Sequence, residues 1–539
     1  MAPWVAQEKR MKQSQDASRT LRVLFLLFLL AVWTGSWSPC LAVQSPDSIQ
    51  RIQQLLQAGD TAAARSLLSQ ALRESPGRAG LYNLQGVLEA TDGDFASAEA
   101  SFRRAIKLAP DLEGAYLNLG RLYQEHIPKD FAARDKALDV YAALLRFAPD
   151  HQEANYQSAV LLMQKRLYQA SLEHLARLPA DAQNHSQALS VQCGDSVGLG
   201  QREKAERAAN QILQAPDLAE ADVTSILPIL TQRKGAPLAV MLLEGLVARQ
   251  LASFDSLQSL GLLYKRSGQL ANARQTLEAA AQLRPGSVPN LLDLARLAEE
   301  QKDYTGALGY LAHARELEPG NAAIHFLWGM ICVEDNLAEE AYQALKKAVT
   351  LDPGNAYYNY ALGAVAFERE DASESILYFQ KYCELKPRDP RGRLALGAAY
   401  FNNHDNEKAE EILKTVSNDS QTTAGAHYYL GRIANRKGDY SQAIRHLRMA
   451  LSASPDFADA YAELGLVHLK QKEYPQAEEA LQRALKLNAD SYTANLNLMV
   501  LYQRTGSPKA GEQAKRFEQV KEARAQRARE LLRAIRVEP

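Results

Sequence analysis

Residue types that commonly carry catalysis or bind metals are few and far apart in this 539-residue chain. The four cysteines (Cys40, Cys193, Cys332 and Cys383) form no CxxC pair, and the ten histidines form no HExxH motif. A zinc site needs such close ligand pairs, and a disulfide framework needs more cysteines. The sequence also lacks GxGxxG, GxxxxGKS/T and GxSxG, which bind nucleotides or present a nucleophilic serine. We therefore expect no cofactor, no metal and no catalytic residues, and the chain is not predicted to be an enzyme.

Charged residues offer acid–base chemistry or nucleic-acid binding, and neither is favoured. Acidic pairs such as Glu299-Glu300 and Glu478-Glu479 are most simply solvated helix faces. Lys+Arg number 62 against 63 Asp+Glu, so no net field attracts nucleic acid. The end of the chain is rich in Arg and Lys, but Glu512, Glu518 and Glu522 are interleaved with them. We expect a charged capping helix there and no nucleic-acid partner.

A repeat of 34 residues is the strongest pattern in the sequence, and it indicates the elements that would position any site. A small residue recurs at Gly261, Ala295, Gly329, Gly363, Gly397, Gly431 and Gly465. A second recurs at Ala273, Ala307, Ala341, Ser375, Ala409, Ala443 and Ala477, and a third at Ala280, Ala314, Ala348, Ala450 and Ala484. Large residues recur at Leu277, Leu311, Leu345, Phe379, Leu413, Leu447 and Leu481. Prolines recur at Pro285, Pro319, Pro353, Pro387 and Pro455.

Each of these columns has a physical role in a helical hairpin. Small residues allow two helices to cross closely, and the large residues fill the space between them. Proline follows the second helix, where it cannot continue the hydrogen-bond ladder. One repeat therefore predicts a helix, a tight turn, a second helix and a proline. Cys332 falls at a buried position of its repeat, so we expect a packed free thiol.

This pattern closely resembles the tetratricopeptide repeat family, for example in Trp328-Gly329 with Ala341, Ala348 and Pro353. The resemblance implies an all-α, right-handed superhelical solenoid of antiparallel helix hairpins, with a concave groove lined mainly by the first helices. We expect an N-terminal array over residues 45–253, degenerate from about 180, a regular array over 254–507 and a charged capping helix over 508–539. The segment Glu125 to Lys136 is predicted to lengthen a turn.

The resemblance also places particular first-helix residues in the groove, where a protein or peptide of unknown identity would bind. The residues carried over to partner-binding positions are Phe326, Met330, Tyr357, Tyr360, Phe367, Leu394, Phe401, Tyr428 and Arg432. Rigid aromatic side chains with a charge at the edge suit a peptide-binding surface. The alternative is that these side chains pack against neighbouring repeats as core. Family members that bind acidic tails use a lysine where this chain has Phe326, Tyr360, Leu394 or Tyr428, so such a tail is not expected.

The N-terminus indicates export. A basic stretch precedes an unbroken apolar run from Val23 to Trp33, and Cys40-Leu41-Ala42 offers a small-x-small cleavage site. These features describe a secretory signal peptide over residues 1–42, and hence a periplasmic or secreted protein. The alternative is an uncleaved anchor in the inner membrane, because an apolar core this short can span only with polar neighbours. The sequence thus predicts an extracytoplasmic interaction scaffold or, alternatively, a membrane-tethered assembly platform for envelope or secretion machinery.

Overall fold

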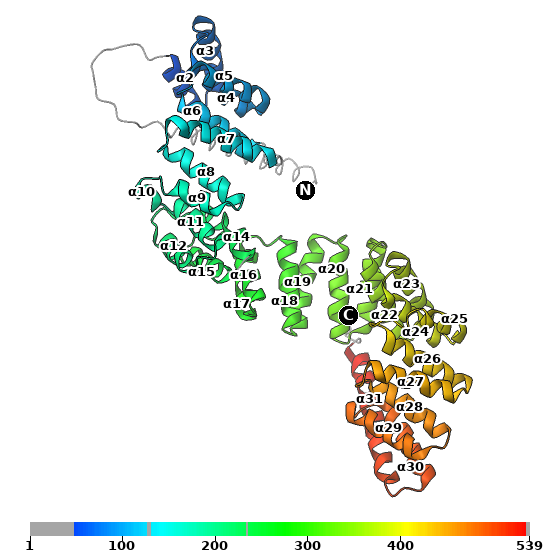
Figure 1. The fold of residues 1–539 in the computed structure, drawn as a ribbon. Coiled ribbons are helices and arrows are strands. Elements are labelled where there is room, and N and C mark those ends of the chain that lie inside the picture. Colours follow the sequence, from blue (N-terminus) through cyan, green and yellow to red (C-terminus); the bar gives the residue numbers. More distant parts are fainter. Residues whose placement is uncertain (1–47, 127–130, 233–234, 535–539) are drawn as a thin grey trace. The chain divides into compact units, whose positions relative to one another are not determined.

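The computed structural model describes residues 48–126, 131–232 and 235–534, and these ranges contain helices and turns without a strand (Figure 1). The chain divides into two compact units, the first ending at Leu263 and the second beginning at Tyr264. The boundary lies inside helix α16 (Phe254–Arg266), ten residues after the predicted start of the regular array. Each unit is a stack of helical hairpins, which confirms the predicted all-α hairpin architecture.

Helices follow one another at short, regular intervals in both units. In the first unit they are α2 (Ser48–Gln57), α3 (Thr61–Glu74), α4 (Ala79–Asp92), α5 (Phe95–Leu108), α6 (Glu113–His126), α7 (Phe131–Phe147), α8 (Gln152–Gln164), α9 (Tyr168–Leu175), α10 (Ala180–Gln183), α11 (Ser186–Gly198), α12 (Arg202–Gln214), α13 (Glu220–Thr224), α14 (Leu227–Gln232) and α15 (Ala236–Ala248). In the second they are α17 (Leu270–Leu283), α18 (Val288–Glu300), α19 (Tyr304–Leu317), α20 (Ala322–Glu334), α21 (Ala338–Leu351), α22 (Ala356–Glu368), α23 (Ala372–Leu385), α24 (Pro390–Asn402), α25 (Asn406–Lys414), α26 (Thr423–Lys437), α27 (Tyr440–Ala453), α28 (Ala458–Lys470), α29 (Tyr474–Leu487), α30 (Tyr492–Thr505) and α31 (Ala510–Ala534).

The turn inside each hairpin uses one residue in the left-handed backbone region. In successive repeats this residue has positive φ and recurs every 34 residues, at Gly268, Lys302, Asn336, Glu370, His404, Gly438, Lys472 and Gly506. An aspartate often follows and caps the second helix: the Asp303 carboxylate accepts a hydrogen bond from the Gly306 amide at 2.9 Å. Such caps satisfy a backbone donor that the first helical turn leaves unpaired.

The predicted packing columns form the core of each hairpin. Ala273, Leu277 and their equivalents at the 34-residue spacing are almost fully buried. The glycine column lies on the first helix directly against the large residue of the second helix. A Cβ placed on Gly465 would be 2.6 Å from Cγ of Leu481, closer than two carbons can approach. Cys332 is a free, buried thiol, as predicted.

Irregular hairpins occur where the sequence supplies breakers. Pro228 lies at the start of α14 and interrupts a first helix, which is therefore split into α13 and α14. Within the predicted regular array, α25 ends early at Lys414, and the chain passes through turns to α26. The segment from Glu125 to Lys136, predicted to lengthen a turn, is largely helical on both sides of residues 127–130, and α7 is correspondingly long.

The last helix of the second unit covers the end of its stack. In α31 the side chains of Phe517 and Val520 are buried, and the Phe517 ring lies 5.2 Å from that of Tyr492 in α30. Arg516 forms an ion pair of 2.7 Å with Asp490. The predicted signal peptide of residues 1–42 lies outside the described residues.

Candidate functional site

The residues predicted to bind a partner lie on four consecutive first helices of the second unit, and these helices contact one another in order. Phe326 and Met330 are on α20, Tyr357, Tyr360 and Phe367 on α22, Leu394 and Phe401 on α24, and Tyr428 and Arg432 on α26. Tyr357 is 58% exposed, Phe401 is 1% exposed, and the remaining side chains are half-buried. The set therefore lies along one surface, but its side chains differ in how much of their area is exposed to solvent.

Several of these aromatic rings are packed inside the stack, either between neighbouring hairpins or within one hairpin. The Phe326 ring lies 4.7 Å from that of Tyr358, and the Tyr360 ring lies 4.9 Å from that of Tyr382 on α23. Burial raises the pKa of Tyr360. Edge and tilted contacts of this kind stabilise the stack itself. The half-buried aromatics thus serve the fold with one side and leave only an edge available to a ligand.

Phe401 is covered by two arginines of the neighbouring first helix, so its ring is not available to a ligand. The guanidinium carbon of Arg436 lies 3.5 Å from the ring centroid and that of Arg432 lies 4.5 Å from it. Arg436 also donates a hydrogen bond of 2.9 Å to the carbonyl oxygen of Phe401. The two guanidiniums therefore lie over the Phe401 ring, which the sequence analysis predicted to contact a partner.

This arginine pair (Arg432 and Arg436) holds two like charges close together, and the nearby Glu463 offsets them only in part. Among the described side chains, neither guanidinium lies within ion-pair distance of a carboxylate. Burial and then the charge of Arg432 lower the pKa of Arg436, as expected for two like charges held close together. An anionic group placed here would relieve that repulsion.

The polar side chains next to the arginine pair are already bonded to one another. Glu463 on α28 is buried and accepts a hydrogen bond of 2.5 Å from the Asn435 amide. Lys470 donates to the other end of that amide at 2.7 Å. Glu463 and Asp459 are the carboxylates nearest this cluster, against the three cations Arg432, Arg436 and Lys470. Arg436, at the end of its helix, occupies one of the first-helix positions that the family resemblance turns toward the groove.

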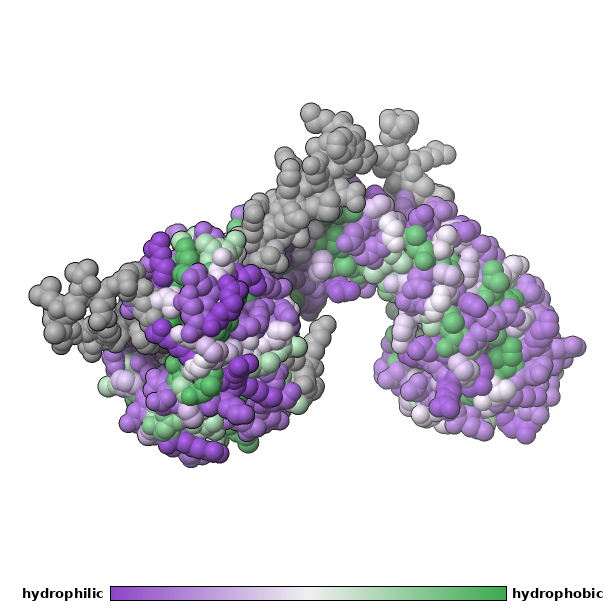
Figure 2. All heavy atoms as spheres, turned by 90° about the horizontal axis from the view of Figure 1, so that it is seen from above, coloured by the Kyte–Doolittle hydropathy of each residue, from purple (hydrophilic) through white to green (hydrophobic). Residues whose placement is uncertain are grey.

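Other kinds of site were sought in the same residues. In the described ranges, no three His, Cys, Asp or Glu side chains gather as a metal ion would require. No helix there combines the length and the apolar character needed to cross a membrane. On the face drawn in Figure 2, hydrophobic residues form small patches separated by hydrophilic surface.

Stacked hairpins with a 34-residue spacing define a helical-repeat protein. One model of the tetratricopeptide repeat matches residues 50–113, 394–456, 430–492 and 462–510, and a second matches 265–325 and 298–365. Together these segments take in about half of the chain, and they lie in both units. The chain belongs to the tetratricopeptide repeat family, whose arrays are in general non-catalytic scaffolds for protein–protein interaction. The scaffold role is thus supported by the family and by the fold together.

Solved structures with similar architecture come from several sources. One is a tetratricopeptide repeat protein from Parabacteroides merdae, with 17% identity, covering 46% of this chain and 98% of that one at a TM-score of 0.40. Another is the Cut9–Hcn1 hetero-tetramer of the APC/C, with 14% identity, 89% and 99% coverage and a TM-score of 0.37. Yeast Tom70 has 14% identity, 85% and 99% coverage and a TM-score of 0.32. No curated protein sequence matches the chain.

Proposed function

We propose that the chain binds a segment of a partner protein along the first helices α20 to α26 of its second unit. The observation that carries this proposal is the arginine pair, Arg432 and Arg436, which lacks a carboxylate partner among the described residues and lies next to half-buried aromatics. Paired guanidiniums suit a carboxylate side chain of the partner, because they offer several donors in a fixed plane. Tyr357, more exposed than its neighbours, is the aromatic anchor in this proposal.

The structure of the surface limits how the partner can bind. Tyr360 and Phe326 already use part of their area inside the stack, so they contribute edges rather than whole rings. Binding energy would then be concentrated in a few side chains, as is usual at protein interfaces. We therefore assign Tyr357 and Arg432 the largest shares and the half-buried aromatics smaller ones.

A pair of matched double variants tests this assignment. The partner is first captured by the immobilised wild-type chain, identified by mass spectrometry and purified. Its affinity is then measured for Tyr357→Ala/Arg432→Gln and for a control, Leu377→Ala/Arg448→Gln, which removes an equally exposed apolar residue and an exposed arginine from second helices. We expect at least a tenfold loss for the first variant and less than a twofold loss for the control. Equal affinities of the two variants would refute the proposed surface.

We further propose that this scaffold works outside the cytoplasm. The basic stretch, the apolar run from Val23 to Trp33 and the small residues up to Ala42 support export. A tethered assembly platform is the second candidate, favoured by the same apolar run if it is retained. N-terminal sequencing of the mature protein distinguishes them: a chain beginning after Ala42 is a released scaffold, whereas an intact N-terminus in the membrane fraction indicates the platform.

A further inference from the structure

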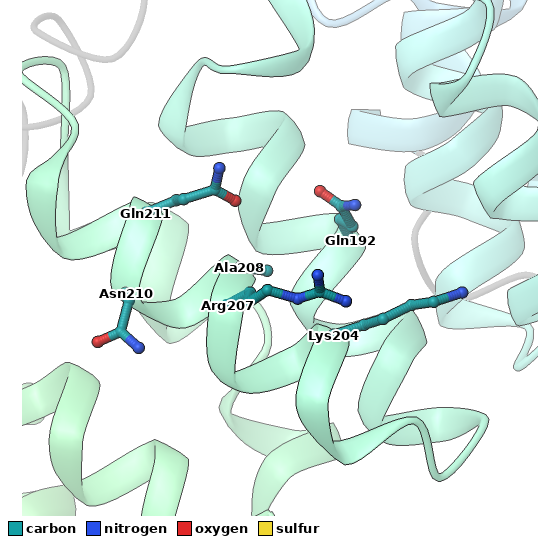
Figure 3. A pocket seen from close by; sticks show the side chains of 6 residues that line it. All are labelled: Gln192, Lys204, Arg207, Ala208, Asn210 and Gln211. Atoms are coloured by element: carbon teal, nitrogen blue, oxygen red, sulfur yellow. The ribbon is translucent and has the colours of Figure 1, made fainter.

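A hollow on the first unit is lined by cationic side chains with no ion pair among the described residues and by amide side chains. It is separate from the first-helix surface of the second unit. It has a volume of about 630 Å³ and is lined by Gln192 of α11 and by Lys204, Arg207, Ala208, Asn210 and Gln211 of α12. Figure 3 shows the Arg207 guanidinium ending below Gln192, while Lys204 extends to the right past it and Asn210 points away on the other side. No carboxylate lines this α11–α12 hollow.

Both cations are available to a ligand. The same helix pairs Arg202 with Glu206 at 2.6 Å, but no ion pair of the described residues includes Lys204 or Arg207. Glu203 lies one helical turn before Arg207, at a spacing that commonly forms an ion pair, yet the two are not within ion-pair distance. The only acidic groups on this helix therefore do not neutralise the hollow.

Two of the amides also have unused hydrogen-bonding capacity. Asn210 donates to the Glu206 carbonyl at 2.9 Å, whereas the side chains of Gln192 and Gln211 take part in no hydrogen bond among the described residues. A primary amide offers both donors and an acceptor. This combination matches the N–H and C=O groups of a peptide backbone better than it matches a bare anion, which needs donors only.

A smaller hollow with both polar and apolar lining adjoins the α11–α12 hollow and shares Gln192 with it. It has a volume of about 210 Å³, and its other lining residues are Leu172, Leu175, Ala176, Gln183 and Ala188. A ligand that spans both hollows would meet the half-buried Leu172 side chain beside the two cations, so an aliphatic group beside its negative charges suits it. A small anion would meet only exposed cations, where water and salt weaken each contact to about 1 kcal/mol or less.

We propose that these two adjoining hollows bind an extended acidic peptide segment, with its carboxylates on Lys204 and Arg207 and an aliphatic side chain among Leu172 and Leu175. The free amides of Gln192 and Gln211 bond the peptide backbone between them. This site lies on the first unit and uses a second helix, α12, so it is separate from the surface proposed above. The chain then has two protein-binding sites, one in each unit.

Fluorescence anisotropy with defined probes tests the site on the full chain. The probe is a labelled synthetic peptide of two leucines followed by three glutamates, and the comparison peptides replace either the glutamates with glutamines or the leucines with serines. We expect measurable binding of the first peptide and at least tenfold weaker binding of both others. Equal binding of the glutamine peptide would overturn the role of the two cations.

Matched variants assign the binding to this place in the fold. Lys204→Gln/Arg207→Gln should weaken the probe at least tenfold, while Arg202→Gln, a paired cation on the same helix, should change it less than twofold. Tyr357→Ala/Arg432→Gln should leave it unchanged, so that failure here and failure of the surface in the second unit are distinguishable. Complete displacement of the probe by 10 mM inorganic phosphate at constant ionic strength would overturn the peptide assignment in favour of a small-oxyanion site.

Discussion

Adding one methyl group at Gly120 should destabilise the first unit, although the same change normally favours a helix. A Cβ on Gly120 would lie 2.4 Å from Cζ of Tyr141, and two further atoms of that side chain are within 2.7 Å. Tyr141 is fully buried, and its hydroxyl donates to Gln124 at 2.7 Å, so the ring has no open space into which it can move. Overpacking of this kind costs about 1–3 kcal/mol, and the helix propensity of alanine returns about 1 kcal/mol. The middle of these ranges leaves a net loss of about 1 kcal/mol for Gly120→Ala.

Gly309 provides the matched control. It is exposed in the interior of α19, and a Cβ there would meet no atom within 4 Å, so Gly309→Ala should gain about 1 kcal/mol from propensity alone. Urea unfolding gives each change in stability, and hydrogen exchange reports whether the loss is confined to α6 and α7. This chain already packs Ala295 in the same core as Leu311, so Gly120→Ala/Tyr141→Leu should recover part of the loss. A Gly120→Ala protein as stable as the wild type would refute the close-crossing argument.

Three further predictions concern buried titratable groups and the hairpin turn. Burial raises the pKa of Asp195 to about 7, so the free energy of unfolding should fall as the pH rises from 4 to 7, by up to about 4 kcal/mol. Urea titrations at these two pH values should show that Asp195→Asn removes this decrease. Burial lowers the pKa of both His427 and His446, whose Nδ1 atoms lie 3.0 Å apart, so the stability they contribute is complete above about pH 6.5 and is lost on acidification. Melting at pH 7.5 and 5.0 should show a smaller shift for His427→Gln/His446→Gln than for the wild type. Lys302→Gly should raise the free energy of unfolding by about 1 kcal/mol, because Lys302 has φ of 60°.

The hairpins could be predicted because each packing column keeps its residue type. Leu277 and its equivalents stay large and apolar, and the glycine opposite stays small, so period and chemistry coincide in the sequence. The left-handed turn residue recurs with the same period, but its residue type varies. Gly268 indicates a positive φ from its type alone, whereas Lys302 and Glu370 do not. The backbone conformation there is imposed by the two helices on either side, and a single sequence does not record that constraint.

The candidate site was less predictable, for a related reason. The helical register tells which side of a helix a residue occupies, but not which side chains of the neighbouring helices cover it. Tyr360 shares its predicted side of α22 with Tyr357, yet only the former meets an aromatic of α23. Phe401 was predicted to contact a ligand, and its exposure depends on Arg436, which lies two helices further along the chain, on α26.

In both units polar groups bond one another between successive first helices, but the second unit also holds arginines that form no ion pair among the described residues. This difference bears on where a partner binds. In the first unit such bonds join Asn118 to Asn83 at 3.0 Å and Gln124 to Gln157 at 3.0 Å. Arg121 is likewise paired with Glu153 at 2.9 Å. A ligand there would have to replace bonds that already exist, and the exchange of one neutral hydrogen bond for another yields little net free energy. At Arg432 no ion pair among the described residues must be broken, so an incoming carboxylate adds an interaction instead of exchanging one, and binding to this surface is favoured on the second unit.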